Sequence, residues 1–125
     1  MDILSREDLT KIISVFYEKL LSDSLMLPFF EEMRTKNSLE KHLEVLVDFW
    51  QDVVFDTSTY TNNTLQKHLA INTFMKFERA HFTRWISYFL ETIDERFTGV
   101  NAEKMKARAR SIATVMQIKM NLYEK

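Results

Sequence analysis

Two histidines, one tyrosine and one tryptophan are the residues of this chain that could do chemistry together. His42, His68, Tyr17 and Trp85 each lie in a largely apolar stretch of the sequence. A neutral imidazole nitrogen is a strong ligand for a transition metal, whereas a buried tyrosine or tryptophan has one hydrogen to donate. One histidine could therefore hold a metal from one side, while the other donors bind a small polar ligand on the opposite side.

Each of these residues, taken alone, has a simpler explanation. A lone histidine beside leucines, such as His68, is more often a core residue than a metal ligand. Tyr17 and Trp85 could be core residues whose polar tips reach water, and His42 could bond a backbone carbonyl. We expect His81 to be exposed. Together, however, these residues favour a shared ligand site, because Tyr17, His42 and Trp85 offer three donors from three helices that could converge on one point.

The composition predicts an all-α protein with one domain over residues 1–125. The chain has one glycine and one proline, which are too few for the tight turns of a sandwich or barrel. Ten phenylalanines are a heavy aromatic content for a small helical domain, and they suggest a large apolar object to enclose, although a well-filled core is the simpler reading. The absence of cysteine excludes disulfides, iron–sulfur clusters and thiol chemistry.

Charge and hydropathy argue against two classes of partner. The net charge of −1 provides no strong field for nucleic acid or acidic lipid. The basic residues between 104 and 110 alternate along a helix, so they predict a solvated face rather than a nucleic-acid site. The sequence shows no signal peptide and no membrane span, and we expect a cytoplasmic protein.

Apolar residues at steps of three and four predict long helices in the first half of the chain. Ser5 followed by Asp8 predicts a helix start, and this helix should run to about residue 22. A short segment over 25–33 follows, in which Pro28 prevents one continuous helix. A helix over about 38–55 should carry one inward stripe, formed by His42, Leu46, Phe49, Trp50 and Val53.

The second half should contain a polar loop, a short helix and two long helices. Residues 56–64 are the loop, and 65–69 form the short helix that carries His68. A helix over 77–97, ended by Gly99, should turn Ala80, Trp85, Phe89, Ile93 and Phe97 inward. Asn101 should cap the last helix, whose buried face should comprise Met105, Ala109, Ile112, Val115, Met116 and Met120.

Several of these residues also match a known family in order and spacing. They are Phe16-Tyr17, Pro28 before Phe29-Phe30, His42 seven residues before Phe49-Trp50, His68 eighteen after Trp50, His81 to Trp85, and the run from Arg108 to Ala113. In these elements the chain resembles the group III truncated haemoglobins over about residues 5–120. Two stretches differ: Asn62-Asn63-Thr64 stands where relatives often have Gly-Asn-Pro, and Ala70-Ile71 where they often have Leu-Pro.

The resemblance implies a truncated globin fold, in which two crossed helix pairs surround haem b and the proximal helix is much shortened. His68 would be the iron ligand on the proximal side. Tyr17, His42 and Trp85 would form a polar distal pocket. The remaining haem contacts would come from Phe29, Phe30, Leu46, Phe49, Trp50, Leu65 and Phe89. Lys67 and Arg79, or else Lys76 and Arg84, are candidates for pairing with the haem propionates.

Three functions follow from these observations. The first is a haem protein that binds dioxygen and other diatomic gases, such as nitric oxide or carbon monoxide, at a pentacoordinate iron. The second is a nitric oxide dioxygenase or peroxidase-like enzyme that uses the same pocket with a separate reductase, since the chain has no flavin or nicotinamide motif. The third is a cofactor-free helical interaction module. His42 could gate the pocket or ligate the iron.

Overall fold

Helices make up nearly all of the chain that the computed structural model describes, namely residues 1–35, 39–57 and 78–119. In these ranges the elements are α1 (Arg6–Leu21), α2 (Leu27–Thr35), α3 (Leu39–Phe55), α5 (Arg79–Asp94) and α6 (Val100–Lys119). No strand occurs in the described ranges. The predicted all-α fold is therefore confirmed.

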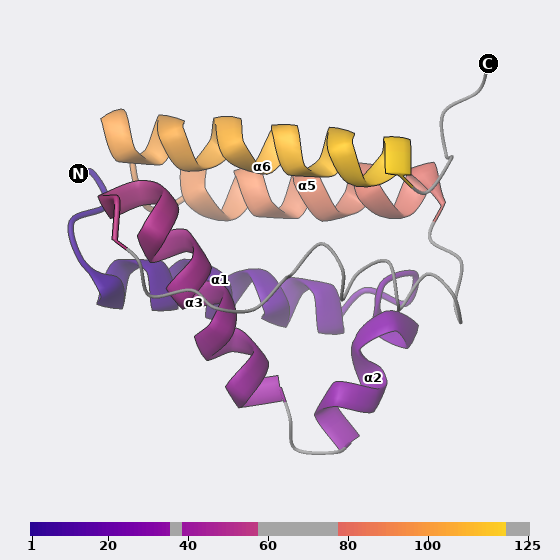
Figure 1. Cartoon of the computed structure of the whole chain (residues 1–125). Helices are drawn as coiled ribbons and strands as arrows, with labels where there is room; N and C mark the ends of the chain where they lie inside the picture. The colour runs from indigo at the N-terminus through magenta and orange to yellow at the C-terminus, as the bar shows by residue number, and fades with distance from the viewer. Residues whose placement is uncertain (36–38, 58–77, 120–125) are drawn as a thin grey trace.

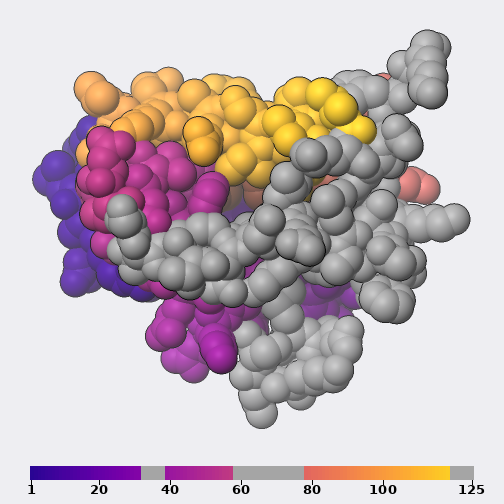
Figure 2. Space-filling view, viewed as in Figure 1, coloured from indigo at the N-terminus to yellow at the C-terminus, as the bar shows by residue number. Residues whose placement is uncertain are grey.

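The helices form two pairs that cross. α3 lies across α1, and α5 and α6 run side by side, as Figure 1 shows. The pairs are joined because α1 also packs against α5, and α3 against α6. In the space-filling view the side chains of α3 and α6 meet on one face of the molecule (Figure 2). This arrangement brings residues of α1, α2, α3 and α5 together in one core.

α1 begins where the sequence predicts. The Ser5 hydroxyl accepts a hydrogen bond from the backbone N–H of Asp8 at 3.3 Å, which satisfies one of the unpaired donors of the first turn. The buried face of the helix follows the expected spacing. Its members are Leu9, Ile12, Ile13, Phe16, Tyr17 and Leu20.

α2 begins at Leu27, one residue before Pro28, and is a separate helix from α1, as the proline predicts. Pro28 is the second residue of this helix, where its missing N–H leaves no hydrogen bond unmade because first-turn donors have no helical partner. Phe29 and Phe30, which follow it, are both buried. The proline therefore fixes a new helix direction that turns two aromatic rings into the core.

α5 differs from the prediction in its bounds and in its inward face. It covers Arg79–Asp94 rather than 77–97, and Phe97 is buried beyond its end. Ala80, predicted inward, is exposed, and His81, predicted exposed, is buried. The reason is local: the Nδ1 atom of His81 accepts the backbone N–H of Glu78 at 2.7 Å, so the imidazole caps the helix start.

α6 also differs at its start and on one position of its face. Asn101 was predicted to cap it, but the carboxylate of Asp2 accepts the backbone N–H groups of Asn101 and Ala102, both at 2.9 Å. Gly99 permits this approach, since a Cβ at this position would lie 2.4 Å from Cγ of Asp2. On the predicted buried face, Val115 is 42% exposed. The cap was missed because its acceptor, the carboxylate of Asp2, is far away in sequence.

Candidate functional site

The centre of the candidate site is a contact between α1 and α3. The hydroxyl oxygen of Tyr17 lies 2.9 Å from Nε2 of His42, and the ring centroids are 5.6 Å apart. Tyr17 is 2% exposed, whereas His42 is half-buried. The fold thus brings together two of the three predicted donors and leaves the imidazole between the tyrosine and the surface.

The environment of Tyr17 keeps its hydroxyl protonated. Burial raises the pKa of Tyr17 far above the ordinary value for tyrosine, because the phenolate would lose its hydration. Tyr17 is therefore a hydrogen-bond donor over the whole physiological pH range. When His42 carries its proton on Nδ1, Nε2 is the acceptor of the Tyr17 hydrogen; in the other tautomer, Nε2–H donates to the hydroxyl oxygen.

Tyr17 belongs to an aromatic cluster. It consists of Phe16, Tyr17, Phe30, Trp50, Trp85 and Phe89, from four helices. Phe16 is central, with its ring edge-on to Trp85 at 5.8 Å and to Phe89 at 5.0 Å between centroids. Phe30 packs edge-on to Tyr17 at 5.4 Å. The donors of the site are thus set in a rigid, apolar wall.

Trp85, the third predicted donor, belongs to this wall. Its indole stacks on Phe89 with a centroid distance of 5.7 Å and an angle of 9° between the planes. Trp85 is half-buried, and within the described residues no hydrogen bond involves its indole N–H. The indole therefore has a donor available for a ligand. Trp85 and Tyr17 both contact Phe16, which joins them within one packed group.

The buried face of α3 is formed by Leu46, Val47, Trp50 and Val54, so His42, Phe49 and Val53, predicted inward, are only half-buried. The side that carries these half-buried residues supplies further apolar surface. His42, Leu46, Phe49 and Val53 follow one another at helical steps, so they share one side of the helix. Leu46 is buried, whereas Phe49 and Val53 are half-buried. Phe49 packs edge-on to Trp50, and Trp50 stacks on Phe89 with centroids 5.1 Å apart. This face retains apolar surface that a planar ligand could cover.

Several predicted site residues lie outside the described residues. They are His68, Leu65, Lys67 and Lys76, so the assigned metal ligand stays a prediction. Within the described ranges, no group of three or more histidine, cysteine, aspartate or glutamate side chains could hold a metal ion. Nor does any described helix have the length and apolar character needed to cross a membrane.

The two described cations proposed for the propionates differ in their surroundings. Arg79 is exposed at the start of α5. Arg84 is paired within the protein, since its Nη1 atom lies 3.0 Å from Oδ2 of Asp23. For both arginines, the pairing with a haem propionate stays a prediction.

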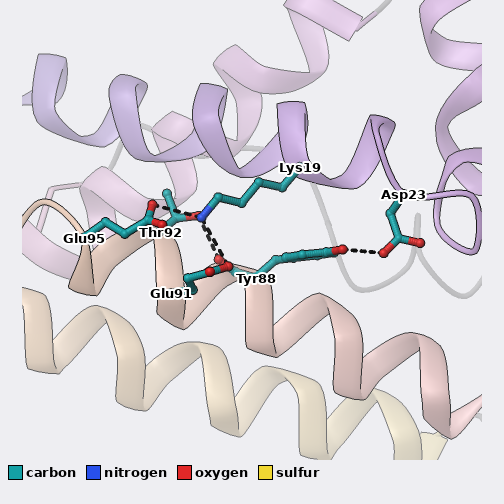
Figure 3. A network of polar contacts seen from close by, with 6 residues as sticks. All are labelled: Lys19, Asp23, Tyr88, Glu91, Thr92 and Glu95. Carbon is teal, nitrogen blue, oxygen red and sulfur yellow. Dashed lines mark hydrogen bonds and ion pairs between the residues drawn. The ribbon is translucent and has the colours of Figure 1, made fainter.

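A buried carboxylate beside this site was not predicted. Asp23 lies at the edge of the core, in the turn between α1 and α2. Arg84 and Tyr88 of α5 donate hydrogen bonds to its carboxylate there. Figure 3 shows the contact of Asp23 with Tyr88, together with Lys19, which pairs with Glu91 of α5 and with Glu95 just beyond the end of that helix. Asp23 stands between two serines and resembles an ordinary helix breaker, so its sequence context contains no signal of this role.

The comparisons with known proteins agree with this architecture. A crystal structure of a group III truncated haemoglobin from Campylobacter jejuni superposes with a TM-score of 0.83, covering 99% of this chain and 97% of the other, at 23% identity. The chain has the fold of a group III truncated haemoglobin. The curated group 3 truncated haemoglobin ctb of Campylobacter jejuni is 23% identical over 118 residues, which are 93% of this chain and 91% of that protein. No protein-family model matches.

The resemblance to the group III truncated haemoglobins is thus confirmed over nearly the full length of the chain. Within this truncated-haemoglobin fold, the two crossed pairs are α1 with α3 and α5 with α6. Tyr17, His42 and Trp85 come from three of these four helices. The fold therefore explains why residues so far apart in sequence form one wall.

Proposed function

We propose that the chain is a haem protein that binds dioxygen and other diatomic gases. The observation that carries the proposal is the hydrogen bond between His42 and Tyr17, a buried residue of the aromatic cluster that also contains Trp85. A core of this size can be built from aliphatic side chains without placing a phenol, an imidazole and an indole together. Their convergence supports a polar ligand as the object they serve.

The described residues fit a haem by their chemistry. Haem needs apolar side chains against its planes, an axial nitrogen ligand and a controlled opposite face. Leu46, Phe49 and Trp50 of α3, with Phe89 of α5, would supply the apolar contacts, and Phe29 and Phe30 would lie at the edge. His68 would supply the axial nitrogen, with Leu65 beside it. Arg79 and Lys67 would pair with the propionates. When bound, haem would supply an iron with one axial position open to a diatomic gas.

Tyr17, His42 and Trp85 would then control what binds at that position. The Tyr17 hydroxyl stays protonated and would donate a hydrogen bond to a ligand with partial negative charge. His42 lies against the same hydroxyl, so it can accept the Tyr17 hydrogen when no ligand is present and donate to the hydroxyl oxygen when Tyr17 turns to a ligand. Trp85 adds an indole N–H. The apolar wall excludes water, which strengthens each of these hydrogen bonds.

The proposal is tested by adding haem to the purified, haem-free protein and following the visible spectrum. The expected result is saturation at one haem per chain, followed by a new spectrum when the reduced protein meets carbon monoxide or dioxygen. An absence of saturable haem uptake would contradict the proposal and leave a helical interaction module. Mixing the oxygenated protein with nitric oxide would then separate gas binding from dioxygenase chemistry, since only the latter consumes both gases repeatedly when a reductase is supplied.

A further inference from the structure

Asp23 is the only described carboxylate that is both buried and bound by two side chains of another helix. Its side chain is 5% exposed, and it lies at the turn that joins α1 to α2. Oδ1 accepts the backbone N–H of Leu25 at 2.8 Å. Arg84 donates to both carboxylate oxygens, at 3.1 and 3.0 Å, and the Tyr88 hydroxyl donates to Oδ2. Every acceptor position of this carboxylate is thus directed at a partner.

The partners of Asp23 flank Trp85. Arg84 precedes Trp85 in α5, and Tyr88 lies one helical turn beyond Arg84 on the same face. Asp23, in turn, follows the end of α1, the helix that carries Tyr17. The Asp23 cluster therefore joins the segment of α5 that contains Trp85 to the turn that follows α1. Figure 3 shows the part of this link that Tyr88 makes with Asp23.

No described residue forms a hydrogen bond with the indole of Trp85. Its described contacts are the edge of Phe16, at 5.8 Å, and the face of Phe89, at 5.7 Å between centroids. Phe16 belongs to α1 and Phe89 to α5, so the indole position depends on how these two helices are placed. Aromatic contacts tolerate small sliding movements better than hydrogen bonds do. A small displacement of α5 would therefore move the indole N–H relative to Tyr17.

Stability alone is a weak reason for this arrangement. Removing a carboxylate from water costs free energy, and the attraction to a cation seldom exceeds that cost by much. Arg84 remains 48% exposed, which weakens its attraction for Asp23 further. The stabilisation by the ionised carboxylate is therefore modest, and placement accounts for the specific geometry of the cluster, in which two residues that flank Trp85 bind one carboxylate.

We propose that Asp23 is a positioning residue of the ligand site. Through Arg84 and Tyr88 it sets the position of the Trp85 indole relative to the Tyr17 hydroxyl, and it thereby controls how long a polar gas stays bound. This inference rests on the proposed gas-binding function, but it concerns a residue that touches neither haem nor ligand.

The test compares Asp23→Asn with Glu95→Gln in the haem-loaded protein. Asparagine keeps the size of the side chain but removes the charge that Arg84 binds. The control removes a charge from the second bridge between the same two helices, the pair of Lys19 with Glu95. The first readout is the nuclear magnetic resonance signal of the Trp85 indole N–H in the carbon monoxide complex, assigned with Trp85→Phe. The second is the dioxygen dissociation rate.

Asp23→Asn is expected to shift the indole signal and to speed dioxygen dissociation by about two- to tenfold, the range that corresponds to one weakened neutral hydrogen bond. Glu95→Gln should change neither. Should Asp23→Asn fail to fold, Tyr88→Phe removes one partner of the carboxylate and should give a smaller shift in the same direction. An unchanged indole signal and dissociation rate in the Asp23→Asn protein, or in Tyr88→Phe where that protein is used, would overturn the inference.

The two proposals fail in different ways. If no variant takes up haem, the proposed function is wrong, yet the indole signal of the haem-free protein still reports whether Asp23 positions Trp85. If haem binds and Tyr17→Phe alters the dissociation rate while Asp23→Asn does not, only the positioning role is wrong.

Discussion

Tyr17 and His42 share a hydrogen bond of 2.9 Å across 25 residues of sequence, between a fully packed hydroxyl and a half-buried imidazole. The bond joins the deepest donor of the site to a residue near the surface. Movement of His42 would therefore affect both the entry of a ligand and the hydrogen that Tyr17 can offer it.

Tyr17→Phe should speed dioxygen dissociation by about ten- to a hundredfold, since a hydrogen bond to a charged group contributes roughly 1.5–3 kcal/mol. Stopped-flow mixing with a trapping ligand measures the rate. Carbon monoxide is the control, because its bound form is less polar and its dissociation should change much less. An unaltered dioxygen rate would move the stabilising role to Trp85 or His42.

His42→Ala should raise the association rate of carbon monoxide by about tenfold, a change within the span usually seen among variants of one binding site. The physical reason is that the imidazole lies between Tyr17 and the surface, so its removal opens the approach. Flash photolysis measures the rate. The control is Lys41→Ala, at the exposed position that precedes His42 in the same helix, and it should leave the association rate unchanged. Equal rates in the two variants would place the entry route elsewhere.

Gly99→Ala should lower the free energy of unfolding by about 2 kcal/mol, through a strained backbone and the loss of a helix cap. The φ angle of Gly99 is +142°, which side chains rarely tolerate, and the new Cβ would displace the Asp2 carboxylate from the start of α6. Urea unfolding measures the change. Val100→Ala, at the exposed neighbouring position, should cost much less, and equal losses would refute the cap.

The stability of the protein should fall in acid partly because of Asp23. Burial pushes the pKa of Asp23 upward, but hydrogen bonds from Tyr88, Leu25 and Arg84 outweigh it, so the pKa lies below its ordinary value. The folded state therefore binds this proton less readily than the unfolded state does, and the stabilisation is present above the ordinary carboxyl pKa and lost as the pH falls through the lowered one.

In a series of urea titrations at decreasing pH, Asp23→Asn should lose less stability than the unaltered protein. Asp2, whose pKa is also lowered, should account for part of the remaining loss. Parallel acid curves for the two proteins would show that the Asp23 carboxylate makes no such contribution.

Local patterns in the sequence predicted the helices well, because capping and apolar spacing depend on near neighbours. Ser5 and the buried face of α1 are examples. Contacts between distant segments could not be predicted in this way. Asp2 caps a helix that starts 98 positions later, and Asp23 binds partners 61 and 65 positions away. The burial of His81 was wrongly predicted because the hydrogen bond from the backbone N–H of Glu78 to its ring, rather than helical periodicity, sets the position of the imidazole.

The candidate site was predictable in part for the same reason. Tyr17 and His42 were assigned to one pocket from their order and from the family resemblance, and they do meet in the structure. The position of Trp85 against Phe89 follows from the helical step of four. The dependence of Trp85 on Asp23 could not be anticipated, since it requires the angle between α1 and α5.

We propose that His68 holds a haem iron on the side opposite Tyr17, and this is tested by comparing the haem content and ferrous spectrum of His68→Ala with those of the unaltered protein. The unaltered protein should bind one haem per chain and show a five-coordinate ferrous spectrum with an imidazole ligand. The variant should lose stable haem, and added imidazole should restore part of it. A variant with full haem content and the original ligation spectrum would contradict the account.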